Sequence, residues 1–119
     1  MEKIKIFDAE YRFMGIVWEN EPINSTELAR LCHNEFGWKK STTYTVIKRL
    51  SERSALKNEN SIVTSLVSRV DVQKYESEQF MEKTFDNSLP NFITTFLQDK
   101  KLSQSEAEQI MKMIREATK

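Results

Sequence analysis

Residues 24–53 read NSTELARLCHNEFGWKKSTTYTVIKRLSER and contain two helix patterns separated by a short turn. Asn24 is a suitable N-cap, and Glu27 stands three residues later, as in a capping box. The first pattern stops at Gly37, a residue type that commonly follows the last turn of a helix. The spacing therefore predicts one helix from Asn24 to about Gly37 and a second helix that begins near Ser41.

The second of these helices has one apolar face and one polar face. Its apolar face consists of Thr43, Val46, Ile47 and Leu50, and Ser54 falls near the same face. The polar face lies in a window, residues 39–57, that has a single acidic residue, Glu52. The basic residues of this window are Lys39, Lys40, Lys48, Arg49, Arg53 and Lys57. Since the whole chain has 18 Lys+Arg and 18 Asp+Glu, the window is a strongly positive region of a neutral protein, as expected of a nucleic-acid contact.

The segments on either side complete a familiar order of elements. Asp8 is a suitable N-cap for a first helix, whose apolar residues are Tyr11, Met14, Val17 and Trp18. Two β-prone runs, residues 55–58 and 61–67, follow the basic helix and are separated by a predicted turn. Three helices and a small hairpin form a winged helix-turn-helix. We therefore expect a mainly α fold with a small β-hairpin, and a DNA-binding domain over residues 1–70.

Residues 71–119 are predicted to form three short helices, capped by Asp71, Ser88 and Ser103. Three short helices in a row cannot cover all of their apolar side chains, so a two-fold homodimer with a shared core is expected. The predicted dimerisation residues are Phe80, Phe85, Leu89, Phe92, Ile93, Phe96, Leu97, Ile110, Met111 and Ile114. The alternative is that these side chains pack on the N-terminal domain.

The basic helix has the side chains that a reader of double-stranded DNA needs. In a helix-turn-helix the second helix of the pair enters the major groove, where hydroxyl and basic side chains reach base edges and phosphates. The predicted groove contacts are Ser41, Thr42, Tyr44, Thr45 and Lys48. The predicted backbone contacts are Lys39, Lys40, Arg49 and Lys57. The alternative reading of this surface is an ordinary solvated helix face.

Other classes of protein have little support in the sequence. The chain has one cysteine, Cys32, and one histidine, His33, so we expect no disulfide, no metal, no cofactor and no catalytic site. We expect Cys32 to be buried and His33 to face solvent. The sequence has no apolar run of about 18 residues and no signal peptide, which favours a cytoplasmic protein without membrane insertion.

Three stretches together resemble the penicillinase-repressor (BlaI/MecI) family of bacterial winged-helix repressors. Residues 37–57, GWKKSTTYTVIKRLSERSALK, are similar to that family's recognition-helix region. Residues 6–29, IFDAEYRFMGIVWENEPINSTELA, are similar to its first two helices, with the same spacing to Trp18. Residues 83–114, KTFDNSLPNFITTFLQDKKLSQSEAEQIMKMI, resemble its dimerisation tail. The resemblance covers almost the whole chain, and it rests on the order of these stretches.

The resemblance implies a homodimeric transcriptional repressor that binds a palindromic operator. In the best-known members a membrane sensor-protease relays an antibiotic signal, and the repressor is cut within its dimerisation region. Carried over by alignment, the scissile bond falls near Thr95 and Phe96. A winged-helix protein-interaction module, or a ligand-sensing regulator without the protease, remains the alternative function.

The chain departs from the family pattern at several positions. The predicted wing, residues 58–66, lacks the usual Gly-Arg turn and tyrosines, and Ser54 stands where the family usually has Gly. Thr95 replaces the usual Asn before Phe96. No cysteine follows Cys32, so the metal mechanism of the copper-responsive branch is excluded.

Overall fold

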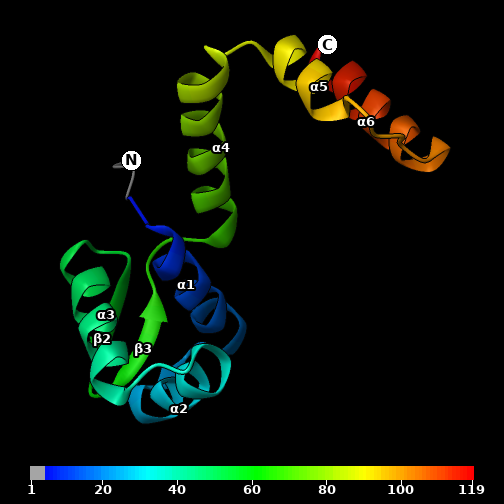
Figure 1. Cartoon of the computed structure of the whole chain (residues 1–119). Coiled ribbons are helices and arrows are strands. Elements are labelled where there is room, and N and C mark those ends of the chain that lie inside the picture. Colours follow the sequence, from blue (N-terminus) through cyan, green and yellow to red (C-terminus); the bar gives the residue numbers. More distant parts are fainter. Residues whose placement is uncertain (1–4) are drawn as a thin grey trace. The chain divides into compact units, whose positions relative to one another are not determined.

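In this computed structural model residues 5–119 are described. The chain divides between Ser77 and Glu78 into two compact units (Figure 1). The first unit contains α1 (Asp8–Asn20), β1 (Ile23–Asn24), α2 (Ser25–Phe36), α3 (Lys40–Glu52), β2 (Leu56–Glu59), β3 (Ile62–Ser65) and the start of α4 (Arg69–Phe85). The second unit contains the end of α4, α5 (Leu89–Leu97) and α6 (Gln104–Ala117). Helix α4 runs through the predicted domain boundary at residues 70 and 71. Residues 1–4 of the predicted first domain lie outside the described residues.

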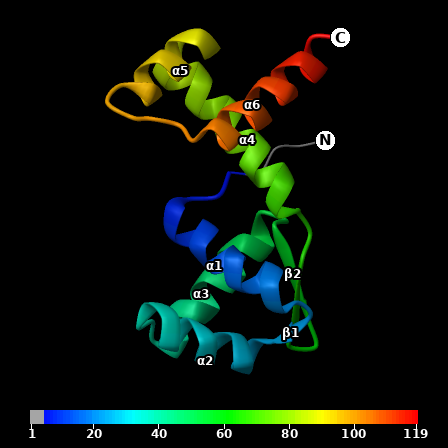
Figure 2. The ribbon, with the colours of Figure 1, turned by 90° about the vertical axis from the view of Figure 1, so that its right-hand side faces the viewer.

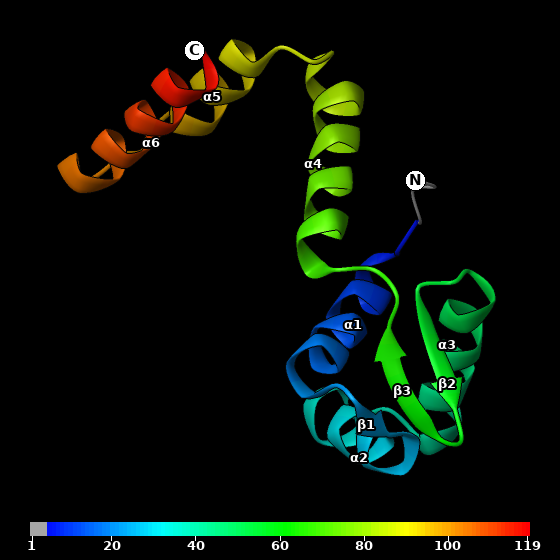
Figure 3. The same cartoon turned by 180° about the vertical axis from the view of Figure 1, so that it is seen from behind.

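The first unit is a winged helix-turn-helix. Its three strands form an antiparallel sheet in the order β1-β3-β2 (Figure 3). The β2–β3 hairpin lies along one side of the three helices (Figure 2). This arrangement confirms the predicted fold class. The sequence analysis did not predict β1, in which Ile23 pairs with Val63 and Asn24 with Ile62.

One apolar core holds the helices and the hairpin of this unit together. Its largest fully buried side chains include Phe13, Met14, Leu28, Leu50 and Leu56. Two residues of the predicted α1 stripe, Tyr11 and Trp18, are only half-buried and pack against the edge of this core. The Trp18 indole Nε1–H donates to the carbonyl of Val67 at 2.9 Å, and Gln73 donates to the Tyr11 hydroxyl at 3.3 Å.

Polar side chains fix where most of the helices begin. Three predicted caps are confirmed, since the side chains of Asn24, Ser88 and Ser103 each accept a backbone N–H in the first turn of α2, α5 and α6. Two predicted caps are wrong. Asp8 is the first residue of α1, with Phe7 as N-cap, and the Glu10 carboxylate accepts the Phe7 N–H at 3.0 Å.

At the start of α4 the Ser68 hydroxyl accepts the N–H of Asp71, so Ser68 takes the capping position expected for Asp71. Ser68 lies directly before the helix, whereas Asp71 is already in its first turn. The capping box predicted at α2 does not form, because the Asn24 side chain caps Thr26 rather than Glu27. Asn24 accepts the N–H of Thr26 at 2.8 Å, while Glu27 forms an ion pair with Arg30 on the same helix.

Helix α3 ends in a Schellman motif that has serine at its left-handed position. The Ala55 N–H donates to the Leu50 carbonyl, and the Ser54 N–H donates to the Ser51 carbonyl. Ser54 has φ +62°, in the region that favours glycine. The serine therefore leaves this turn strained, because a side chain disfavours the left-handed conformation.

Replacing Ser54 by glycine is expected to stabilise the protein. Relief of the left-handed conformation, offset in part by the freedom of glycine in the unfolded chain, gives a gain of about 0.5–1 kcal/mol. The midpoint of thermal unfolding should rise by a few degrees. Ser51→Gly is the matched control, because the same exchange inside α3 should lower the midpoint. A lower midpoint for Ser54→Gly would contradict the assigned strain.

The second unit exposes much of its apolar surface. The rings of Phe80, Phe85 and Phe92 meet edge to face, with centroids 5.3–6.0 Å apart, and Phe96 stacks on Phe92 at 5.8 Å. No residue of α5 or α6 is fully buried. The exposed large apolar side chains of this unit are Phe80, Leu89, Ile93, Phe96, Leu102, Ile110, Met111, Met113 and Ile114.

Candidate nucleic-acid interface

The exposed face of α3 is the centre of the candidate interface. Four residues of the predicted apolar face, Thr43, Val46, Ile47 and Leu50, are the buried residues of this helix, whereas Ser54 lies beyond its end and is exposed. Because the four buried residues fix how the helix is rotated, the predicted contact face points outward. Its exposed residues are Lys40, Ser41, Thr42, Thr45, Lys48 and Arg49, and Tyr44 is half-buried. Lys39, the N-cap of the helix, and Lys57, on β2, are also exposed.

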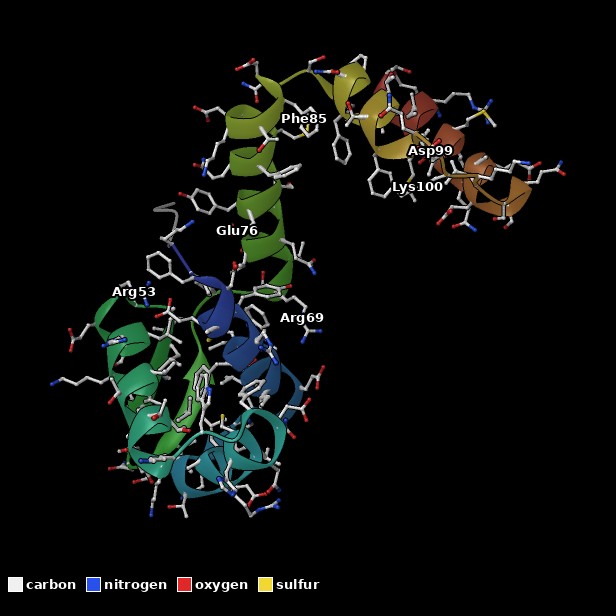
Figure 4. The ribbon with its side chains drawn as sticks, in the orientation of Figure 1. Arg53, Arg69, Glu76, Phe85, Asp99 and Lys100 are labelled. Atoms are coloured by element: carbon white, nitrogen blue, oxygen red, sulfur yellow. The ribbon has the colours of Figure 1, made fainter. Side chains whose placement is uncertain are left out.

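Arg53 belongs to the basic window but not to the exposed face. Its guanidinium forms an ion pair with the buried Glu10 of α1 and donates to the carbonyl of Lys5 at 2.8 Å. Figure 4 shows Arg53 at the end of α3, next to the start of α1. The guanidinium therefore holds α3 to the N-terminal segment, and its charge is neutralised. The remaining basic residues of the window supply its positive charge.

The hydroxyl groups on the α3 face differ in what they can still bind. The Thr45 hydroxyl donates to the Ser41 carbonyl at 2.9 Å, so its oxygen retains lone pairs that can accept a hydrogen bond from a base. The Tyr44 hydroxyl is already occupied, since hydrogen bonds with Thr26 and with Ser25 lower the pKa of this phenol. The ammonium of Lys40, 5.8 Å from the Tyr44 ring centre, acts in the same direction.

A groove of about 270 Å³ opens between α2 and α3. Its lining residues are Thr26, Ala29, Arg30, His33 and Lys40. Three of them, Thr26, Arg30 and His33, were not predicted to be functional. A signal was present in the sequence, because these three are spaced i, i+4 and i+7 and so share one face of α2.

The wing is short and is attached to the helices at two points. Asn60 and Ser61 form its two-residue turn with φ of +53° and +65°, as in a type I′ turn. The carbonyl of Ser61 accepts the N–H of Ser25 at 2.8 Å. The Glu21 carboxylate accepts the backbone N–H of Ser65 at 2.7 Å and its hydroxyl at 2.8 Å. The wing therefore has little freedom to move away from α2.

The lone cysteine and the lone histidine of the sequence lie where they were predicted. Cys32 is buried as expected, and burial raises the pKa of its thiol. His33 is exposed, also as expected. Among the described residues no three His, Cys, Asp or Glu side chains converge as metal ligands. Within residues 5–119 every helix is too short or too polar to cross a bilayer.

The predicted dimerisation residues all lie in the second unit. Seven are exposed: Phe80, Leu89, Ile93, Phe96, Ile110, Met111 and Ile114. The other three, Phe85, Phe92 and Leu97, are half-buried within the unit. Thr95 and Phe96, the predicted cleavage point, are both exposed in the last turn of α5.

Comparison with known proteins gives consistent matches along the chain. The sequence profile of a family described as penicillinase repressor matches residues 6–116. The penicillinase repressor of Bacillus licheniformis is 25% identical over 121 residues, covering 98% of this chain and 94% of that protein. The methicillin resistance regulatory protein MecI of Staphylococcus aureus is 25% identical over 114 residues, covering 92% of this chain and 93% of that protein.

Two solved structures are similar to the first unit. The solution structure of the DNA-binding domain of the repressor BlaI has a TM-score of 0.54 and 28% identity, and the match covers 60% of this chain and 93% of that one. The Bacillus licheniformis BlaI monomer in complex with the blaP half-operator has a TM-score of 0.52, 29% identity and the same coverage. The relatives are repressors and regulators, which agrees with the prediction that this chain is not an enzyme.

Proposed function

The chain belongs to the penicillinase repressor family, and on this premise we propose that it is a transcriptional repressor that binds double-stranded operator DNA through α3. The observation that carries the proposal is the orientation of α3. Its apolar stripe is buried, so its hydroxyl and basic side chains face outward together. An exposed, basic, hydroxyl-bearing helix is the element that a helix-turn-helix protein inserts into the major groove.

The roles of the side chains follow from their positions. Thr45, with free lone pairs on an exposed hydroxyl, reads a base edge, and Lys48 lies three residues, nearly one turn, further along the same face. Lys39 and Lys40, at the start of the helix, bind backbone phosphates. The BlaI monomer that was solved with a half-operator supports this assignment, because its DNA-binding domain has the same fold.

We propose that the functional form is a homodimer built on the second unit. Exposed large apolar side chains are concentrated on α5 and α6, and a two-fold partner would bury them. A dimer presents two copies of α3, which suits a palindromic operator with half-sites separated by whole helical turns. In this arrangement dimerisation through the second unit determines the affinity for paired half-sites. The first unit determines which base sequence each half-site must have.

Relief of repression by a membrane sensor-protease is the corresponding proposal for regulation. Cleavage between Thr95 and Phe96 would detach α6 from the rest of the chain and remove its part of the dimer surface. Both side chains are exposed, and the bond lies in the last turn of a nine-residue helix, where few hydrogen bonds must open.

Two substitutions on α3 are expected to weaken DNA binding in different ways. Binding is measured by fluorescence anisotropy over a salt series, with the duplex upstream of the protein's own gene and with a scrambled duplex. Thr45→Ala should reduce the preference for the first duplex by about fivefold or more, because a base contact is lost. Lys40→Ala should weaken both duplexes alike and lower the salt slope by about 0.9, because a phosphate contact is lost.

Lys74→Ala, on the exposed surface of α4, is the control for the loss of one positive charge, and it should bind both duplexes much like the wild type. If the wild-type protein bound neither duplex at low salt, the repressor proposal would fail for that site. If other two-fold sites failed as well, a winged-helix module that binds protein would be the better description.

A further inference from the structure

The end of α5 is capped by Lys100, three residues after its last residue. The Lys100 N–H donates to the carbonyl of Leu97 at 3.0 Å, and the Gln98 N–H donates to the carbonyl of Thr95 at 3.3 Å. Between these two, the Lys100 ammonium donates to the carbonyl of Phe96 at 2.9 Å. Lys100 therefore satisfies two of the carbonyl groups that a helix leaves without partners at its end.

The Lys100 ammonium makes two further favourable interactions at this helix end. It lies 4.8 Å from the centre of the Phe96 ring, within the range of a cation–π contact. Its positive charge also stands where the last carbonyls of α5 point, and α5 has no basic residue in its own last turn. Asp99, with φ +60°, turns the chain between α5 and Lys100 (Figure 4). The side chain of Lys100 is thereby folded back on the residue that follows the proposed cleaved bond.

These contacts keep the bond between Thr95 and Phe96 in a helical turn. A protease binds the segment that it cuts in an extended conformation, so the last turn of α5 must open first. Opening separates Lys100 from both the carbonyl and the ring of Phe96. When opening and closing are faster than cutting, the rate of cleavage follows the fraction of molecules that are open. Contacts of Lys100 that exist only in the closed turn therefore slow cleavage.

We propose that Lys100 controls cleavage of the bond between Thr95 and Phe96. The bond is protected while the ammonium is bound at the end of α5, and a protease must displace the ammonium before it can cut. The inference rests on the proposed cleavage point and names the residue that regulates it. Lys100 acts through the conformation of α5, so it is a positioning residue for this reaction.

The test uses full-length protein and thermolysin, a protease that cuts before large apolar side chains and so can cut before Phe96. Mass spectrometry follows the fragment that begins at Phe96. Lys100→Met keeps most of the side-chain stem but removes the ammonium, and this fragment should form about three- to tenfold faster than in the wild type. Lys100→Arg keeps a cationic donor and should stay close to the wild-type rate. Lys101→Met is the matched control, because it removes one positive charge from the neighbouring exposed residue and should leave the rate unchanged.

Two further measurements separate opening of this turn from other effects. The amide hydrogen of Gln98, which is bonded to the Thr95 carbonyl, should exchange with solvent faster in Lys100→Met by a similar factor. Cleavage before Ile110, on α6, is the internal reference and should be the same in all variants. The comparison is made at protein concentrations at which sedimentation shows the same oligomeric state for each variant.

Equal rates before Phe96 for the wild type and Lys100→Met, or an equal acceleration by Lys101→Met, would overturn the role of Lys100 and leave the proposed cleavage point intact. Faster cleavage before Ile110 as well would indicate general loosening of the second unit and would also overturn it. If Lys100→Met no longer formed the oligomer of the wild type, Lys100 would belong to the interface instead. No cut before Phe96 in any variant, while other bonds of the chain were cut, would overturn both the role of Lys100 and the proposed cleavage point.

Discussion

Phe96→Asp is expected to convert the protein from a dimer to a monomer. Phe96 is 52% exposed in the last turn of α5, and its ring stacks on that of Phe92. An aromatic side chain that becomes buried at an interface contributes about 2 kcal/mol or more, and two-fold symmetry counts each substitution twice. The dimer dissociation constant should therefore rise by about a thousandfold, as measured by sedimentation equilibrium.

The same substitution should weaken operator binding by about a hundredfold or more, because the two DNA-binding units are no longer tethered. Thr94→Asp is the matched control. It introduces the same charge two residues earlier, on the opposite side of α5, where the side chain is exposed and polar. If Phe96→Asp remained a dimer, or if Thr94→Asp dissociated equally, the assigned dimer face would be wrong.

Leu50→Ala is expected to cause a large loss of stability in the first unit. Leu50 is fully buried and attaches α3 to the core shared with the hairpin. Truncating a buried leucine costs about 2–5 kcal/mol, from lost burial and from the cavity that remains. The midpoint of chemical denaturation should fall accordingly. DNA binding should also fall, because the cavity lies under the contact face of α3.

Leu66→Ala provides the comparison, since Leu66 is 53% exposed just after β3. The same exchange of side chains there should change stability by less than about 0.5 kcal/mol. Similar losses for the two variants would indicate that Leu50 is not the anchor of α3.

The sequence was sufficient to predict the helix-turn-helix, because its signals are local. The apolar stripe of α3 follows from helical spacing within one segment, and the caps Asn24, Ser88 and Ser103 follow from residues at their own helix starts. These features depend little on tertiary structure, so residue type and spacing were enough.

Other features were missed because they depend on residues that are distant in the sequence. Strand β1 has only two residues and exists through its pairing with β3, some 40 residues later. Arg53 was counted with the basic window, but Glu10, which neutralises it, lies on α1. The groove residues Thr26 and His33 were missed because the groove forms only where α3, with Lys40, packs beside α2.

The attachment of the wing to α2 has a consequence for how this protein would recognise DNA. The hydrogen bonds between Ser61 and Ser25 and between Ser65 and Glu21 join the hairpin and the helices into one rigid DNA-binding domain. A rigid domain cannot change the distance between its wing and α3 to fit a duplex of unsuitable curvature. The adjustment must then come from the DNA, so flexible base steps between the contacted positions should be favoured even where no side chain touches them. Part of the operator preference would thus be mechanical rather than chemical.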